Sequence, residues 1–172
     1  MTQKEALNIL KLGKNVFLTG AAGSGKTYVL NKYIRYLKRN HVDVAITAST
    51  GIAATHMNGK TIHSWAHIGI KDYLSPVDLE HMFKRRDLRE AIAEASVLII
   101  DEVSMLHHFR LDMVDAVLRK MHGKDEPFGG IQVILCGDLF QLPPVTRGGR
   151  AEYVTSAAAW EAMDIHVCYL SE

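Results

Sequence analysis

Residues 20–27 read Gly-Ala-Ala-Gly-Ser-Gly-Lys-Thr and match the pattern G-x-x-x-x-G-K-[ST] at every fixed position. An apolar run at residues 16–18 leads into this stretch and a helical pattern follows it, which is the context in which the pattern carries meaning. Gly20, Gly23 and Gly25 allow successive backbone N–H groups to point at one anion, and the dipole of the following helix adds positive charge. The stretch therefore predicts a phosphate-binding loop between a strand and a helix, rather than a glycine-rich turn beside a surface lysine.

The positions inside this loop have different expected roles. Lys26 would reach the β- and γ-phosphates of a bound nucleotide, and the Thr27 hydroxyl would ligate Mg²⁺. The expected nucleotide-contacting residues are Gly20, Ala21, Ala22, Gly23, Ser24, Gly25, Lys26 and Thr27. The loop thus predicts a nucleoside triphosphate and Mg²⁺ as cofactors.

Strand-like and helix-like stretches alternate along the chain, which predicts an α/β fold with a mainly parallel sheet. Near-continuous apolar stretches such as residues 97–100 are typical of strands buried on both faces. Strands are expected near residues 15–19, 42–47, 97–100, 131–136 and 166–170. Helices are expected from a capping box at residues 2–5 to Gly13, from the loop to about residue 40, near 52–57, 78–95 and 109–122, and in an alanine-rich stretch near the C-terminus. Residues 58–76 are expected to be mostly loop.

Composition places the chain among ordinary folded domains. Its 172 residues are 48% hydrophobic and 23% charged, which suits one domain with its own core. Twenty Lys and Arg against 19 Asp and Glu leave a net charge of +1, so binding of a nucleic-acid backbone would need a local basic surface. No apolar run approaches the roughly 20 residues that span a bilayer, and the N-terminus lacks the apolar core of a signal peptide. We expect no membrane association and a location in the cytosol, or with DNA in a nucleoid or nucleus.

Two basic clusters and two cysteines are interpreted as ordinary structural features. The clusters are Lys84, Arg85, Arg86 and Arg89, and Lys32, Arg35, Lys38 and Arg39. Charge runs of this kind are usually solvated helix faces. Cys136 and Cys168 lie far apart in apolar runs, which favours reduced core thiols over a disulfide or a metal site.

Polar side chains follow two of the expected buried strands. Asp101 and Glu102 come directly after residues 97–100, and Gln141 follows the strand at 131–136. In a nucleotide-binding α/β fold such strand ends face the phosphates. Asp101 would hold Mg²⁺ directly or through water, and Glu102 would orient or deprotonate the attacking water. Gln141 could hydrogen-bond the γ-phosphate or that water, whereas the alternative for the acidic pair is a solvent-exposed turn.

Five stretches together resemble the ordered motifs of the Pif-type DNA helicases, the branch of superfamily 1 shared with RecD. The stretches are residues 20–27, 47–54 (Thr-Ala-Ser-Thr-Gly-Ile-Ala-Ala), 61–64 (Thr-Ile-His-Ser), 100–105 (Ile-Asp-Glu-Val-Ser-Met) and 137–145 (Gly-Asp-Leu-Phe-Gln-Leu-Pro-Pro-Val). They occur in the order that the family has them, and five together are far more specific than any one alone.

The resemblance implies further roles at matching positions. Gln3 matches the glutamine that reads the adenine edge, which implies ATP as the nucleotide; its amide could otherwise be an ordinary polar residue at a helix start. Residues expected on the DNA path are Thr50, Gly51, His63, Phe140, Pro143 and Pro144. Hydroxyls and backbone N–H groups suit phosphates, and an aromatic or imidazole face can stack on a base, although a lone His or Phe is more often ordinary packing.

The resemblance also implies an architecture and an activity. The chain is expected to be the first RecA-like domain, residues 1–172, of a helicase that couples Mg²⁺-dependent ATP hydrolysis to 5′ to 3′ translocation on single-stranded DNA. Forked or otherwise structured DNA would be unwound by a monomer, in repair, recombination or telomere maintenance. In this family a second domain supplies arginines that stabilise the transferring phosphoryl group, and no arginine here sits in a matching motif. The 172 residues alone are therefore expected to bind nucleotide and to hydrolyse it poorly.

Two other functions remain open on the residues themselves. A small-molecule or nucleotide kinase would use the same loop, but it would need an arginine-rich lid, and no such segment stands out. A non-catalytic nucleic-acid-binding module could keep nucleotide for structure only. Such a module has no need for a water-activating Glu102, which favours the motor.

Overall fold

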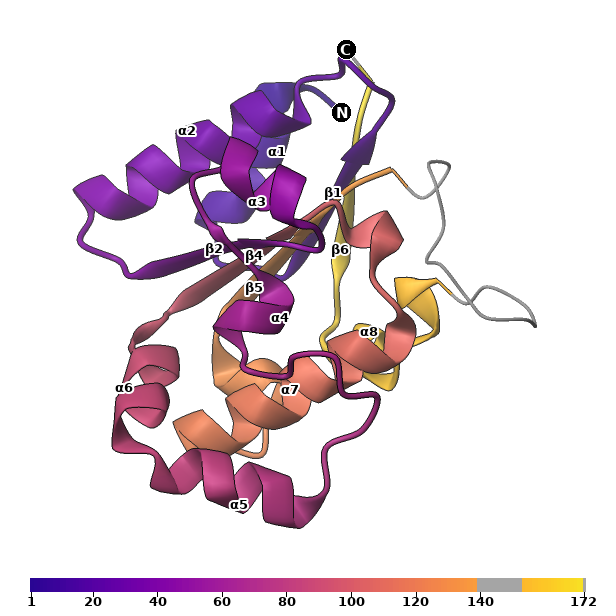
Figure 1. The fold of residues 1–172 in the computed structure, drawn as a ribbon. Helices are drawn as coiled ribbons and strands as arrows, with labels where there is room; N and C mark the ends of the chain where they lie inside the picture. The colour runs from indigo at the N-terminus through magenta and orange to yellow at the C-terminus, as the bar shows by residue number, and fades with distance from the viewer. Residues whose placement is uncertain (139–152, 172) are drawn as a thin grey trace.

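A parallel β-sheet lies at the centre of the computed structural model, which describes residues 1–138 and 153–171 (Figure 1). Its strands are β1 (Val16–Gly20), β2 (Val44–Ala48), β3 (Lys60–Thr61), β4 (Val97–Asp101), β5 (Gln132–Cys136) and β6 (His166–Leu170). Within the described residues they form one six-stranded sheet in the order β3-β2-β4-β5-β1-β6, and each neighbouring pair is parallel. The predicted α/β fold with a mainly parallel sheet is confirmed.

Helices cover both faces of this sheet and complete a three-layer sandwich (Figure 1). One layer holds α1 (Gln3–Lys11), α2 (Lys26–Arg39) and α3 (Gly51–His56). The other holds α4 (Ile62–Trp65), α5 (Pro76–Lys84), α6 (Arg86–Glu94), α7 (His108–His122) and α8 (Ala158–Ala162). Short 3₁₀ turns occur at Val103–Met105, Pro127–Gly130 and Val154–Ser156. Helical crossovers between parallel strands produce this arrangement, because such strands cannot be joined by tight hairpins.

Alternate side chains of the four inner strands β1, β2, β4 and β5 pack into two separate cores. On β4, Leu98 and Ile100 pack with the layer that contains α7, whereas Val97 and Ile99 pack with α1 and α2. All four are buried, which explains why this strand reads as an unbroken apolar run. The two thiols, Cys136 and Cys168, are free and buried, as predicted.

The N-terminal helix begins as the sequence predicts. The Thr2 hydroxyl accepts from the Glu5 backbone N–H at 3.1 Å, and the Glu5 carboxylate accepts from the Thr2 N–H at 3.3 Å. This reciprocal pair is the predicted capping box. Gly13 follows the helix with φ +81°, a conformation that glycine adopts without strain.

Two expectations about the middle of the chain need correction. Residues 78–95 do not form one helix, because Arg85 takes an extended conformation (φ −79°, ψ 101°) and separates α5 from α6. No proline or glycine marks this break, and both helices contact α7. Residues 58–76 are mostly irregular, as expected, but they also contain β3 and α4, which are too short to show a hydrophobic period.

Among the described residues, no helix has both the length and the apolar composition required to cross a membrane.

Candidate active site

The glycine loop connects the end of β1 to the start of α2. Its three predicted bending points have positive φ, with +150° at Gly20, +81° at Gly23 and +96° at Gly25. A Cβ on Gly20 would lie 2.8 Å from the Leu170 carbonyl oxygen, so β6 leaves no room there for a side chain. The loop thus has the glycine-dependent shape that a phosphate-binding backbone requires.

The side-chain polar atoms of Lys26 and Ser24 lie within the glycine loop. The Lys26 ammonium donates to the carbonyl oxygens of Gly20 (2.6 Å) and Ala21 (3.1 Å). Bound phosphates would compete with these two carbonyls for the ammonium, which can exchange one set of oxygen acceptors for another. The Ser24 hydroxyl is buried, and no described residue is its hydrogen-bond partner. Its backbone N–H donates to Ala21, which tightens the turn.

Asp101 ends β4, two strands away from the loop. The register pairs Ile100 with Leu135 on β5, and Cys136 with Leu18 on β1. Asp101 therefore lies near the level of Cys136, at the carboxyl edge of the sheet from which the loop also emerges.

The buried thiol of Cys136 is influenced by both acids and by the lysine. Burial raises the pKa of this thiol well above its usual value, and the neighbouring Asp101 carboxylate raises it further through charge and a hydrogen bond. The Lys26 ammonium acts on the same thiol and lowers its pKa, and Glu102 raises it. Lys26, Asp101 and Glu102 therefore all lie close enough to this buried thiol to influence its pKa. A shared nucleotide crevice formed by these residues stays a prediction.

The oxygen ligands in this crevice fit Mg²⁺. Mg²⁺ is usually held by one or two carboxylates together with substrate phosphates and water, rather than by a cage made of protein alone. In the described part of the chain, no group of three or more His, Cys, Asp or Glu side chains could hold a metal ion. Thr27 and Asp101 would therefore hold the metal only together with phosphate oxygens. The Asp101 Oδ1 also accepts from the Glu102 backbone N–H at 2.9 Å, which fixes its carboxylate.

Gln3 lies against the glycine loop. Its Nε2 donates to the Ser24 carbonyl at 3.3 Å and lies 2.1 Å from the position that a Cβ on Gly25 would occupy. The Thr2-capped helix thus brings the Gln3 amide beside the glycine loop. The adenine-reading role that the resemblance implies for Gln3 stays a prediction.

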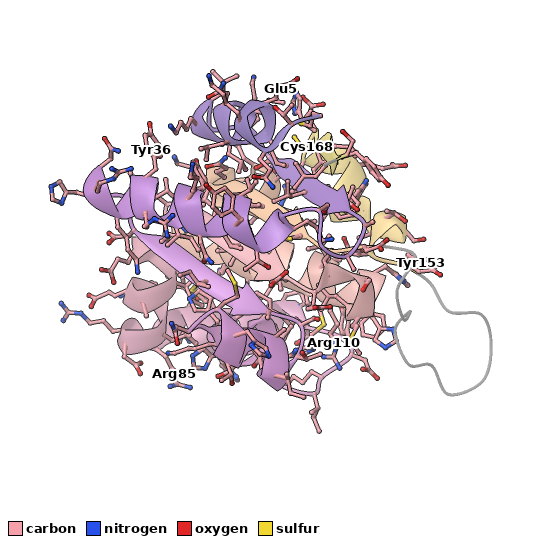
Figure 2. The ribbon with its side chains drawn as sticks, turned by 90° about the horizontal axis from the view of Figure 1, so that it is seen from above. Glu5, Tyr36, Arg85, Arg110, Tyr153 and Cys168 are labelled. Atoms are coloured by element: carbon pink, nitrogen blue, oxygen red, sulfur yellow. The ribbon has the colours of Figure 1, made fainter. Side chains whose placement is uncertain are left out.

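A groove between α1 and α2 extends from Gln3 along the surface. Figure 2, seen from above, shows these two helices side by side on the near face of the sheet. The groove has a volume of about 460 Å³ and is lined by Gln3, Lys11, Tyr28 and Lys32 among others. Tyr28 is 50% exposed, and the Lys32 ammonium lies 5.0 Å from the centre of its ring.

Tyr28 was not among the residues predicted from the sequence. Its position directly after Thr27 was the available signal, since the first turn of this helix would lie beside a nucleotide bound by the loop. An exposed aromatic ring next to the Gln3 amide offers a flat apolar surface on which a nucleobase can stack.

Thr50 and Gly51, expected to contact DNA, begin α3. The Thr50 hydroxyl accepts from the Ala53 N–H at 3.2 Å and caps this helix. A Cβ built on Gly51 would meet no atom outside its own helix and neighbours within 4 Å, and Gly51 is exposed. Thr50 thus acts as an ordinary helix cap, and Gly51 next to it has an accessible backbone.

His63, also expected on the DNA path, lies on α4 next to positive charges. Burial lowers the pKa of His63 below its ordinary value, and Arg110 and His107 lower it further through charge. Arg110 also donates to the carbonyl oxygens of residues 69–71 and pairs with Asp72 at 3.3 Å. These contacts hold a loop that presents Ile70, which is 94% exposed. The sequence alone gave no sign that Arg110 organises this surface.

Four predicted site residues fall outside the described residues. They are Phe140, Gln141, Pro143 and Pro144. Gly137, just before them, packs so closely that a Cβ on it would lie 3.1 Å from the Val103 backbone nitrogen. The strand end that leads to Gln141 therefore lies against the turn that follows Glu102.

Comparison with known proteins gives one consistent family. PIF1-like helicases match residues 2–171 of this chain. The ATP-dependent DNA helicase Pif1 of Psychrobacter sp. (strain PRwf-1) is 57% identical over 175 residues, which cover 100% of this chain and 27% of the relative. The chain thus spans about a quarter of the length of this relative.

Solved structures agree with the sequence comparison. The crystal structure of Pif1 helicase from Candida albicans has a TM-score of 0.91 at 33% identity, covering 99% of this chain and 39% of that chain. A Bacteroides Pif1 helicase in complex with ADP-AlF3 and ssDNA has a TM-score of 0.83 at 34% identity, covering 99% of this chain and 41% of that chain.

Proposed function

This chain belongs to the PIF1-like helicase family, and from that premise we propose that it is the first ATP-binding motor domain of a DNA helicase. Its role would be to couple ATP hydrolysis to 5′ to 3′ movement along single-stranded DNA and to unwinding of forked duplexes, in repair, recombination or telomere maintenance. The observation that carries this proposal is that the glycine loop with Lys26 and the acidic pair Asp101 and Glu102 follow the carboxyl ends of nearby parallel strands, at the same end of the sheet. The nucleotide and the single strand in the matched Bacteroides structure agree with it.

The nucleotide would be ATP with Mg²⁺. Backbone N–H groups of residues 20–27 and the Lys26 ammonium bind the phosphates, while Thr27 and Asp101 supply metal ligands. Gln3 reads the adenine edge, and the base lies in the groove beside Tyr28. When bound, the metal neutralises charge that develops on the phosphates. Glu102 accepts the proton of the attacking water, and Gln141 hydrogen-bonds the γ-phosphate or that water.

Single-stranded DNA would lie across the surface formed by α3 and α4. The accessible Gly51 backbone and the Thr50 hydroxyl suit phosphate oxygens, and His63 offers a face to a base. Burial and positive surroundings lower the pKa of His63 and so favour its neutral form, in which the ring stacks without a charge to desolvate. Phe140, Pro143 and Pro144 would complete this path.

ATP turnover would need a second motor domain. The chain covers 27% of its Psychrobacter relative, so the relative has ample length for one. Arginines from such a domain are worth about 10³–10⁵ in rate in comparable enzymes. We therefore expect residues 1–172 alone to bind ATP and to hydrolyse it at a rate at least about a hundredfold below that of the full-length protein with DNA.

The experiment measures phosphate release by the full-length protein with and without a single-stranded oligonucleotide. Strong stimulation by DNA supports the motor, and unwinding of duplexes that carry only a 5′ or only a 3′ single-stranded tail gives the direction. Transfer of phosphate to a nucleoside monophosphate would instead support a kinase. Equal turnover with and without DNA, with no unwinding, would exclude the proposed function.

Glu102→Gln tests the chemistry directly. The variant keeps the size and hydrogen-bonding reach of the side chain but cannot accept a proton, so ATP should bind with unchanged affinity while turnover falls at least about a hundredfold. Binding of a fluorescent ATP analogue and single-turnover hydrolysis in the full-length protein measure the two effects separately. An active Glu102→Gln protein would show that Glu102 does not accept the proton of the attacking water.

A further inference from the structure

Ser49 connects the strand end that leads to the DNA segment with the strand end that carries the acids. It follows β2 directly, and its backbone N–H donates to the Asp101 carbonyl at 3.0 Å. Its hydroxyl donates to the Glu102 carbonyl. Both hydrogen bonds cross from β2 to the end of β4, so Ser49 holds the backbone of the two acidic residues in place.

The backbone that Ser49 holds has an uncommon conformation. Glu102 has φ 55° and ψ 42°, in the left-handed region that residues other than glycine, asparagine, aspartate and histidine rarely adopt. Only contacts from the surroundings keep a residue there, and such conformations are frequent at functional sites. The Glu102 N–H donates to the Asp101 carboxylate. The Glu102 carbonyl accepts from the Ser49 hydroxyl and also from the Met105 N–H at 3.2 Å, and of these two donors only Ser49 comes from another strand end.

Ser49 is also the residue before Thr50. Thr50 caps α3, and Gly51 is the first residue of that helix. A ligand that moves the start of α3 therefore moves Ser49 through a single peptide bond. The proposed DNA contact and the hydrogen bond to Glu102 are thus made by neighbouring residues of the chain.

We propose that Ser49 is a positioning residue that transmits DNA binding at Thr50 and Gly51 to the backbone of Glu102. In this arrangement DNA contact sets the position of the Ser49 hydroxyl, which sets the left-handed turn and with it the direction of the Glu102 carboxylate. This inference rests on the proposed function, and it identifies a physical connection by which DNA stimulates ATP hydrolysis.

Ser49→Ala in the full-length protein tests the connection. The maximal ATP turnover with saturating single-stranded DNA should fall at least about fivefold, while the KM for ATP and the affinity for DNA stay within about twofold of the wild type. Turnover without DNA does not use this connection and should change less, so the ratio of DNA-stimulated to DNA-free turnover should fall. Ser49→Thr keeps a hydroxyl at the same position and should recover most of the ratio.

Thr47→Val is the matched control. The Thr47 hydroxyl makes the same kind of bond between the same two strands, donating to the Ile99 carbonyl at 2.7 Å, but it ends two residues before Asp101. Its loss should lower the melting temperature without changing the stimulation ratio. A merely structural role of Ser49 predicts that both variants behave alike.

The outcomes separate this inference from the function on which it rests. If wild-type turnover does not respond to DNA, both proposals are wrong. If the wild type responds and Ser49→Ala keeps the full ratio, or Thr47→Val loses as much of it, only the role of Ser49 is wrong. A loss of ratio with Ser49→Ala, recovered by Ser49→Thr and absent from Thr47→Val, is the supporting result.

Discussion

Gly25 has two reasons to be a glycine. Its φ is +96°, and a Cβ there would meet the Gln3 amide at 2.1 Å. Gly25→Ala would strain the loop by about 1–2 kcal/mol and displace the amide from the Ser24 carbonyl. We expect ATP affinity to fall about tenfold or more, since about 1.4 kcal/mol corresponds to one decade. Titration with a fluorescent ATP analogue measures the loss.

Gly13→Ala provides the control for backbone strain. Gly13 has φ +81°, and a Cβ on it would have no atom within 4 Å, so alanine there strains the chain without touching the loop. Both variants should lose similar thermal stability, and only Gly25→Ala should lose ATP affinity. An unchanged affinity in Gly25→Ala would show that the fit between the loop and Gln3 is unimportant for binding.

The sequence predicts residues whose role follows from their type and local spacing. Glycines with positive φ, the lysine of the loop and the acids after a buried strand were all identified in this way. Ser49 was not, because its role depends on the register between β2 and β4, which pairs Ala48 with Asp101. No spacing in the sequence gives that register.

At the scale of elements, the first turn of α2 places the aromatic ring of Tyr28 next to the glycine loop. Base stacking on an aromatic side chain is worth about 1–3 kcal/mol. Tyr28→Ala should therefore weaken ATP binding about 5- to 150-fold, and Tyr28→Phe should keep it, because the ring rather than the hydroxyl makes the contact. Affinity for inorganic tripolyphosphate should not change in either variant. Competition titrations with ATP and tripolyphosphate distinguish the contribution of the base from that of the phosphates.

Tyr36→Ala is the control on the same helix. Tyr36, labelled in Figure 2, stacks on Tyr33 with 5.9 Å between the ring centres. The Lys11 ammonium lies 4.7 Å from the centre of the Tyr36 ring. Its removal takes a similar ring from α2 but not from the groove beside Gln3. Equal losses of ATP affinity in Tyr28→Ala and Tyr36→Ala would contradict stacking and indicate a general weakening of the helix.

Element boundaries show where sequence patterns stop being informative. The five-residue strands and amphipathic helices such as α2 were located to within one or two residues. The separation of α5 from α6 at Arg85 was missed, because tertiary contacts with α7 rather than a local breaker place both helices. The short β3 and α4 were missed because a hydrophobic period needs more residues than they contain.

At the scale of the whole molecule, the two edges of the sheet have different tasks. The carboxyl edge carries the loop and the acids. At the amino edge, Asn15 joins three elements: its Oδ1 accepts from the Val133 N–H at 2.8 Å, its Nδ2 donates to the Met163 carbonyl at 2.8 Å, and its carbonyl accepts from the His166 N–H at 2.8 Å. The residues proposed to bind nucleotide thus lie at one end of the strands, and the hydrogen bonds of Asn15 lie at the other end.

This separation predicts a variant that changes stability alone. Asn15→Ala leaves the N–H of the buried Val133 without its partner, at a cost of about 1–3 kcal/mol. For a chain of this size each kcal/mol lowers the melting temperature by about 2–4 °C, so a decrease of about 2–12 °C is expected. Affinity for ATP should stay unchanged, since the five-residue strand β1 separates Asn15 from the loop. Asn40→Ala, which removes an exposed side-chain bond to the Tyr36 carbonyl, should change neither quantity. A loss of ATP affinity in folded Asn15→Ala would show that the two edges are coupled, because the bonds at the amino edge would then be needed to shape the loop at the other.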